Sequence, residues 1–209
     1  MNLRKWMKLF LMSIMIGALA SAVTGIVMML TDQEFQVTGT SGWLFNIAMM
    51  ALIGLTFGAF SHMGFFAYLM LNYIARSIIK RPYIWLSLQA FVAVFALAEI
   101  GYWTFESEFP TYVYWAVPLV LLVVSTLVAW RKTSETSSGA WIPTLFFLIV
   151  VTTVESVPAF RTGSISSLIF QMVPLFVCNA YQIMQLHRIL GNEAKAPIAS
   201  NPKTSKASS

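Results

Sequence analysis

Six apolar stretches are separated by short polar joints, and the charge of these joints alternates in sign along the chain. The N-terminal segment, the second and fourth joints and the C-terminal segment are mainly basic, whereas the first and third joints carry only acidic side chains. With six membrane crossings, 12 of the 13 Lys and Arg would lie on one side. Because basic loop residues favour the cytoplasm, the pattern predicts that both termini are cytoplasmic. The residues that carry it are Arg4, Lys5, Lys8, Asp32, Glu34, Arg76, Lys80, Arg81, Glu106, Glu108, Arg131, Lys132, Arg188, Lys195, Lys203 and Lys206.

The composition agrees with a membrane protein. The chain is 58% hydrophobic and only 10% charged, and its mean hydropathy is +0.74. A soluble domain would have about 25% charged residues. We therefore assign the net charge of +5 to membrane edges, where basic side chains set orientation and meet anionic lipid, rather than to a nucleic-acid-binding face.

We predict an all-α fold: a polytopic membrane bundle of six transmembrane helices. A span needs about 20 apolar residues, so the longer second span must tilt, kink or begin with an interfacial turn. A cleaved signal peptide is the alternative for the first span, but its apolar run continues to Leu30, which favours an uncleaved anchor. All seven tryptophans lie near predicted span ends, as indole prefers the headgroup level. The predicted spans are about 9–30, 43–75, 83–103, 111–130, 140–158 and 165–186.

Little of the sequence is left outside these spans. We predict a membrane domain over residues 1–190 and a disordered cytoplasmic tail over residues 191–209, which is rich in Ala, Ser, Lys, Pro and Asn. No joint is long enough to form a nucleotide-binding, kinase or DNA-binding domain. Cys178 is the single cysteine, and no Cys/His spacing indicates zinc, so we expect neither a metal site nor a cofactor.

The sequence Gly-Thr-Ser-Gly at 39–42 resembles the nucleophile motif of rhomboid-type intramembrane proteases, which also have six spans. A nucleophilic serine needs a base within hydrogen-bond reach. His62 lies 21 residues beyond Ser41 on the same predicted helix, about 30 Å away, and His187 is expected at the opposite membrane face. We therefore expect no catalytic residues, and interpret the motif as a turn before the second span.

Gly54, Gly58 and His62 recur every four residues and so share one face of the second span. Small residues at this spacing allow close helix approach, and Gly17, Ser21 and Gly25 form a similar stripe on the first span. We interpret the face of the second span as a packing surface and a candidate contact for a partner protein. A sensing or proton-transfer role for His62 is the alternative.

Glu99 and Glu155 are predicted near the outer ends of their spans, and Arg161, in the fifth joint, is the one basic residue predicted outside. An outer polar cluster, with Arg161 paired to either carboxylate, is one interpretation; a small pocket open to the outside is the other. Several amides inside the spans predict interhelical hydrogen bonds. They are Asn46, Asn72, Gln89, Gln171, Asn179 and Gln182.

Four segments resemble the KinB-signalling pathway activation proteins (the KbaA type) of endospore-forming bacilli. They are GWLFN at 42–46, SHMGFFAY at 61–68, NYIAR at 72–76 and EIGYW at 99–103. The similarity covers residues 1 to about 190. It implies a multi-spanning plasma-membrane protein that helps the sensor histidine kinase KinB feed phosphate into the sporulation phosphorelay, with no known active site.

Both approaches lead us to expect a non-enzymatic membrane protein that promotes a KinB-type kinase pathway through helix contacts. The expected partners are the kinase or its accessory proteins and the lipid bilayer, without nucleic acid. The alternative is a small-solute or ion carrier that uses Glu99, Glu155 and His62. A carrier needs polar groups that converge at the membrane midplane, and the sequence predicts both carboxylates near one end.

Overall fold

The computed structural model describes residues 3–32 and 39–194, and for Leu3, Thr40 and 188–194 only the backbone is described. These residues are almost entirely helical and contain no strand, which confirms the predicted all-α class. Six helices are long and apolar enough to cross a membrane, as predicted. The elements are α1 (Leu3–Thr31), α2 (Thr40–Ile78), α3 (Pro82–Glu106), α4 (Thr111–Glu135), η2 (Ser138–Ala140), α5 (Trp141–Phe146), η3 (Phe147–Val151), α6 (Thr152–Glu155), α7 (Val157–Phe160) and α8 (Ile165–Ala194).

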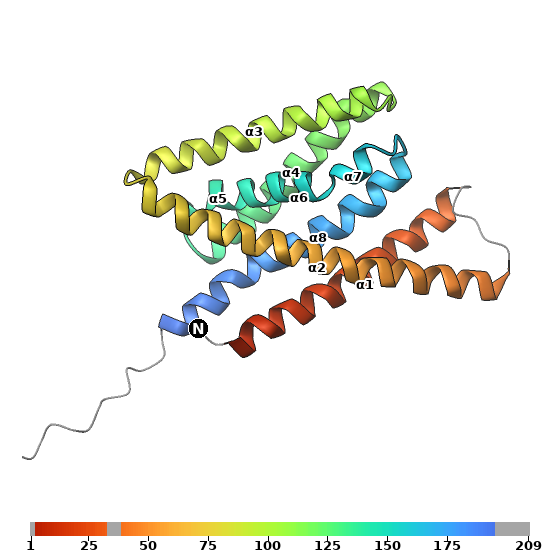
Figure 1. Ribbon diagram of the computed structural model, residues 1–209, viewed down its shortest axis with the longest axis horizontal. Helices are drawn as coiled ribbons and strands as arrows, with labels where there is room; N and C mark the ends of the chain where they lie inside the picture. The colour runs from red at the N-terminus through yellow and green to blue at the C-terminus, as the bar shows by residue number, and fades with distance from the viewer. Residues whose placement is uncertain (1–2, 33–38, 195–209) are drawn as a thin grey trace, which may run out of the picture.

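The helices extend beyond most of the predicted spans. The 39-residue α2 is one continuous helix, so the long second span needs no interruption. The predicted tail begins at 191, but α8 continues to Ala194, and the rest of that tail lies outside the described residues. The start of α1 and the end of α8 lie at one end of the bundle, here named the terminal end, and the opposite end is the distal end (Figure 1).

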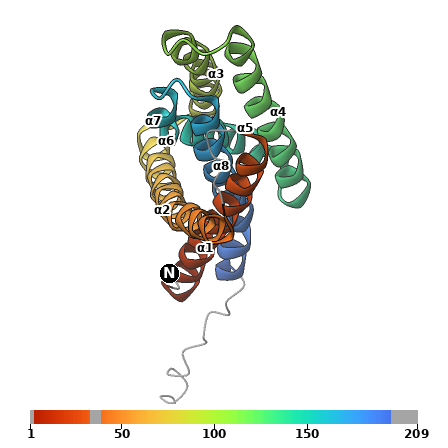
Figure 2. The same cartoon turned by 90° about the vertical axis from the view of Figure 1, so that its right-hand side faces the viewer.

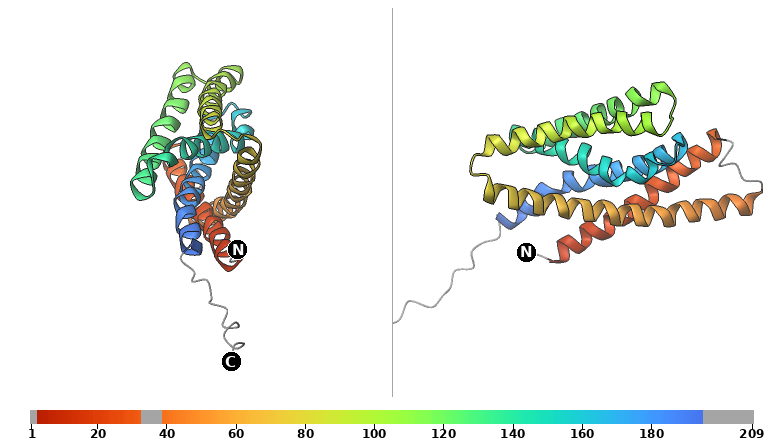
Figure 3. Two further views of the ribbon diagram at one scale, coloured as in Figure 1. Left: turned by 90° about the vertical axis from the view of Figure 1, so that its left-hand side faces the viewer. Right: turned by 45° about the horizontal axis from the view of Figure 1, so that its top comes forward.

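The helices fall into two groups joined by α8. Helices α1 and α2 cross in Figure 1, and α8 packs against both of them and against α6 and α7. Helix α3 packs against α4 and α5, whereas it barely contacts α2. In Figure 2, α4 stands at the edge of the bundle. The right-hand view of Figure 3 shows the fifth span between α3 and α8, so this span is the centre of the fold.

The fifth span is broken into α5, η3, α6 and α7. Pro143 occupies the first turn of α5, where its missing N–H costs no hydrogen bond. The π-helical segment η3 follows, and its Phe147, Leu148 and Ile149 are all fully buried. Three consecutive helical residues point in very different directions, so their common burial requires neighbours on every side. These neighbours are α2, α3, α4 and α8.

The contact between α1 and α2, here named the glycine seam, is built on small residues. A Cβ atom on Gly54 would lie 2.7 Å from the Ala18 Cα, and one on Gly58 would lie 2.6 Å from the Ile14 Cα. The same atom on Gly17 would lie 2.8 Å from the Gly58 backbone nitrogen. The two backbones therefore touch, as small residues four apart permit.

Helix α4 is packed unevenly along its length. Its buried residues Leu121, Ser125, Ala129 and Lys132 follow one face toward the terminal end, whereas only Val113 is buried near the distal end. Pro118 separates the two halves and removes one backbone hydrogen bond from the helix. Helix α4 is thus anchored at the terminal end and loosely held at the distal end.

Candidate functional site

A chain of polar side chains joins α2, α6 and α8 in the interior, and is here named the polar chain. Gln182 Nε2 donates to Ser61 Oγ at 2.9 Å, and Ser61 Oγ donates to Asn179 Oδ1 at 2.8 Å. The Asn179 Nδ2 group donates to Glu155 Oε2 at 2.8 Å and to Thr152 Oγ1 at 3.1 Å. Ser61, Thr152, Asn179 and Gln182 are each fully buried. The donors follow one direction, from Gln182 to Ser61, from Ser61 to Asn179 and from Asn179 to Glu155. The polar chain therefore ends on the Glu155 carboxylate.

Glu155 is held closely from two sides. Gln171 Nε2 donates to the Glu155 backbone carbonyl at 2.9 Å, one of the few bonds that tie the end of the fifth span to α8. The carboxylate lies against Gly64 of α2, where a Cβ atom would collide with Oε1 and would lie 2.7 Å from Val151 Cγ1. Among the described residues, the buried Glu155 Oε1 has no hydrogen-bond partner. Gly64 therefore makes the room that Glu155 occupies.

The polar chain lies near the middle of the bundle. Ser61 is 21 residues from the start of α2 and 17 from its end. Asn179 is 14 residues into α8, or about 21 Å along that helix. The sequence predicted Glu155 at the outer end, and its side chain instead joins residues at mid-length. Glu155 is the last residue of the apolar segment Ser138–Glu155, so its backbone lies at the end of that segment while its carboxylate bonds to Asn179.

The hydrogen bonds of the polar chain connect three helices. The two hydroxyls in the polar chain, on Ser61 and Thr152, have no histidine hydrogen-bonded to them. His62 is adjacent to Ser61 in sequence but points into an aromatic cage, with ring centroids 5.0 Å from Phe10 and 4.7 Å from Phe66. Within the described part of the chain, no group of three His, Cys, Asp or Glu could hold a metal ion.

The predicted partner-contact face of Gly54, Gly58 and His62 is covered. All three residues face α1 of the same chain, with Gly54 and Gly58 in the glycine seam and His62 against Phe10. The packing interpretation is therefore correct, and the prediction that a partner helix binds to this face is wrong. The stripe on α1 explains the difference, because Gly17 is the small residue that fits against Gly54 and Gly58.

The predicted cluster of Glu99, Glu155 and Arg161 does not form. Among the described residues, no ion pair joins Arg161 to either carboxylate. Arg161 is exposed at the distal end, where it lines a 610 Å³ pocket together with Glu106 and Ser107. Glu99 is half-buried on α3 and does not reach the polar chain. Glu155 departs from the predicted cluster because its side chain points inward, toward Asn179.

Most of the predicted interhelical amide bonds are present. Asn72 Oδ1 accepts from Trp85 Nε1 at 2.8 Å and from Gln89 Nε2 at 3.3 Å, and these bonds link α2 to α3. Gln171, Asn179 and Gln182 bond across helices as described above. Asn46 is half-buried and has no side-chain hydrogen bond to another described residue.

The sequence analysis missed a cluster at the terminal end of α4 and α8, here named the lysine clamp. Lys132 is buried, and its Nζ donates to the Ile183 carbonyl at 2.7 Å and lies 3.0 Å from His187 Nδ1. His187 Nε2 is 3.8 Å from Glu135 Oε2, and Glu135 also pairs with Arg131 at 3.0 Å. The Lys132 position next to Arg131 in a basic joint looked like a simple orientation signal. Its distinguishing feature is its position three residues after Ala129 and seven after Ser125, which places it on their face of α4.

Ser41 lies in the first turn of α2 at the distal end, and Gly39, with φ of 91°, precedes that helix. His62 is on the same unbroken helix, and His187 is at the terminal end. Neither histidine reaches Ser41, so the arrangement of a rhomboid-type protease is not formed.

Comparisons with known proteins match most of the chain. Residues 17–189 match the family described as KbaA, KinB-signalling pathway activation in sporulation. The KinB-signaling pathway activation protein of Bacillus subtilis (strain 168) is 27% identical over 192 residues, which are 89% of this chain and 97% of that relative. No solved structure matches the chain. The chain therefore belongs to the KbaA family of KinB-signalling pathway activation proteins.

Proposed function

We propose that this chain is a non-enzymatic integral membrane protein that promotes the activation of a KinB-type sensor histidine kinase and thereby sporulation. The observation that carries the proposal is the family match over residues 17–189. The six apolar helices support a position in the plasma membrane. The alternating joint charges support cytoplasmic N- and C-termini.

The proposed mechanism is a difference in packing against two states of a membrane partner, either the kinase or one of its accessory proteins. A partner shifts a conformational equilibrium only by the difference in its affinity for the two states. Because α1 covers the glycine seam, the contact must use another surface. Helices α3 and α4 offer large exposed apolar side chains, such as Phe91, Val94, Trp115 and Leu119.

A complementation experiment tests this function. The chain is expressed in a Bacillus subtilis strain that lacks its own KinB-signaling pathway activation protein, and heat-resistant spores are counted. We expect recovery of spores when sporulation depends on KinB, and no effect when another kinase drives it. Normal membrane levels of the chain without any recovery would contradict the proposal.

Reporter fusions test the proposed orientation. Fusions after Lys132 and at the C-terminus should be active only as cytoplasmic reporters, whereas fusions after Glu108 should be active only as external ones. An external C-terminus would contradict the orientation.

One observation favours a second function, that of a carrier for an ion or small solute. The polar chain converges near the middle of the bundle, as a carrier site would. Glu155→Gln separates the two functions, because the amide retains an oxygen that accepts from Asn179. If KinB-dependent sporulation persists in this variant, a carrier role of the Glu155 carboxylate in signalling is excluded.

A further inference from the structure

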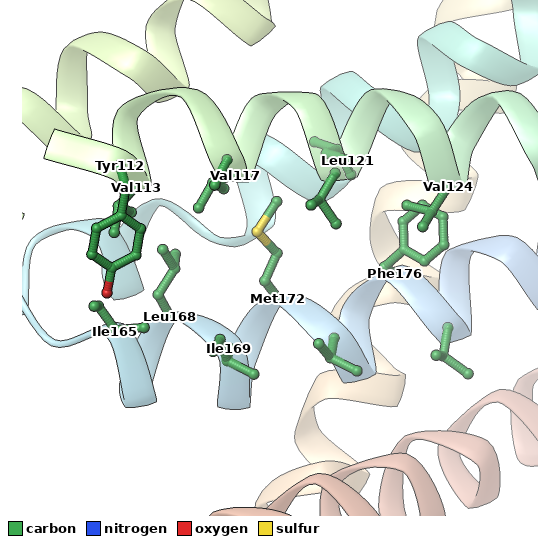
Figure 4. A pocket seen from close by; sticks show the side chains of 14 residues that line it. Tyr112, Val113, Val117, Leu121, Val124, Ile165, Leu168, Ile169, Met172 and Phe176 are labelled. Carbon is green, nitrogen blue, oxygen red and sulfur yellow. The ribbon is translucent and has the colours of Figure 1, made fainter. Parts of the chain in front are cut away.

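An apolar groove runs between α4 and α8 at the distal end of the bundle. Its volume is 440 Å³, within the range of about 300–1,000 Å³ for small-molecule sites. The floor contains buried Val113, Leu121 and Leu168. The side chains in Figure 4 point from both helices into the same space, and the Tyr112 hydroxyl, near one end, is the one polar side-chain group among the lining residues.

The groove lies beside a polar connection between the two helices. At the terminal end, the lysine clamp connects α4 to the Ile183 carbonyl of α8. Nearer the distal end, the exposed rim residues Val120, Ile169 and Val173 leave the groove open along its side. Pro118 of α4 and Pro174 of α8 both lie within the length of the groove. Proline inside a helix is a common cause of kinks.

The length of the groove matches half of a bilayer. It extends from Tyr112 to Val124 on α4 and from Ile165 to Val177 on α8. Twelve helical residues span about 18 Å, and one leaflet contributes about 15 Å of hydrocarbon. A groove that begins at one end of a membrane bundle and stops near the middle fits a single acyl chain.

A second helix fits the groove less well. A transmembrane partner helix crosses the full hydrocarbon core of about 30 Å, well beyond the length of about 18 Å of this groove. Helix contacts in membranes are also enriched in Gly, Ala, Ser and Thr, and in side chains that hydrogen-bond across the contact. The groove contains one small residue, Ala116, among β-branched and larger side chains.

We propose that the groove between α4 and α8 binds one acyl chain of a membrane phospholipid, from the leaflet at the distal end. Its apolar lining, lateral opening and one-leaflet length identify this ligand. The inference rests on the membrane position proposed above. Lipid binding is measured on the purified protein, so a failure here is distinguishable from a failure to promote sporulation.

The test uses the full chain in nanodiscs that contain a phosphatidylglycerol with a photoactivatable group in its acyl chain. After illumination, labelled peptides are mapped and the masses of bound lipids are measured by native mass spectrometry. We expect label on residues 112–124 and 165–177, and one retained phospholipid per chain. Val120→Trp, which fills the groove, should lower the labelling about tenfold. Val123→Trp is the matched control, since Val123 is exposed on the same helix but does not line the groove.

Ala116→Phe is the second groove-filling variant if Val120→Trp does not fold, and it should have the same effect. Equal labelling of the groove and of the exposed face of α3 around Phe91 would show ordinary annular lipid and overturn the proposal. Unchanged labelling in both groove-filling variants would do the same. Retention of a free fatty acid instead of a phospholipid, or a crosslink to a protein helix in the groove, would show that the assigned occupant is wrong.

Discussion

The glycine seam, between the antiparallel α1 and α2, and the groove between the parallel α4 and α8 are two ways for helices to meet in one bundle. At the seam, Gly17, Gly54 and Gly58 bring two backbones into contact, and one added Cβ atom would overlap the opposite helix. At the groove, Val and Ile side chains lie between the helices along about 18 Å of their length. A buried lysine connects the two helices at the terminal end. The seam is determined by shape, whereas the helices of the groove are connected by the polar contacts of the lysine clamp.

This difference indicates where the molecule tolerates change. The two backbones of the seam are already in contact, so an added side chain would force the helices apart. Because dispersion attraction falls rapidly with distance, this separation would lose much of the packing energy of the seam. The outer half of α4 has few packing partners, and regions with few buried contacts open at low free-energy cost. We therefore expect substitutions to destabilise the seam most and the groove least.

The largest effect should come from filling the seam. Gly54→Leu combined with Gly58→Leu should destabilise the protein by roughly 3 kcal/mol or more, since each side chain would overlap α1. The measurement is the thermal unfolding midpoint in detergent, followed by tryptophan fluorescence, together with the level of protein in membranes. Gly101→Leu is the control, because a Cβ atom there would meet the Tyr114 carbonyl at an ordinary 3.6 Å. Similar losses in both would contradict the importance of the seam.

A smaller loss should follow from removing the amide that connects the two groups of helices. Asn179→Leu deletes bonds to Ser61, Thr152 and Glu155. At about 0.6 kcal/mol for each bond, the loss of stability should be about 2 kcal/mol. Asn46→Leu provides the matched control, because the Asn46 side chain bonds to no other described residue. A stability equal to that of the Asn46 variant would show that the polar chain does not hold the bundle.

The lysine clamp should contribute less. Lys132→Met removes the donor to the Ile183 carbonyl but also relieves the burial of a charge, so we expect a loss of about 1 kcal/mol. A spin-label pair on the distal ends of α4 and α8 should report a broader distance distribution. Arg131→Met should change stability by less than about 0.5 kcal/mol, because its pair with Glu135 is exposed. If the distance distribution is unchanged, the clamp does not position α4.

The smallest effect should come from enlarging a residue in the groove. Ala116→Leu adds three carbons in open space, so its effect on stability should stay below about 0.5 kcal/mol. Gly58→Ala adds a single carbon at the seam and should nevertheless destabilise more. The reverse order, measured by unfolding midpoints in the same detergent, would remove the contrast between the two regions.

The fold was predictable because hydropathy and loop charge are local properties. The length of each span can be determined from its own run of apolar residues. The spacing of Gly54 and Gly58 likewise predicts close helix packing, whichever helix packs against them. The identity of the neighbour depends on the packing order of the helices, which no single stretch encodes. For that reason the seam was assigned to a partner protein, although Gly17 of the same chain fills it.

The polar chain was predictable only in part. Asn179 and Gln182 were expected to bond across helices, but Ser61 and Thr152 resemble ordinary small residues of a span. The inward direction of the Glu155 side chain was not predictable, because nothing in the run Phe147–Val151 distinguishes a π-helical turn from an α-helical one. Lys132 was missed since a lysine at a span end usually extends to the interface.

The position of α8 has a consequence for biosynthesis. A chain is made from its N-terminus, and its early segments fold first. The pair α1 and α2 and the group from α3 to α7 both precede α8, which packs against both groups. Until the last helix leaves the ribosome, Ser61 and Glu155 have no Asn179 to bond. A truncated product without α8 therefore keeps these polar groups within apolar helices but lacks the Asn179 bonds, and unsatisfied polar groups are costly within a bilayer.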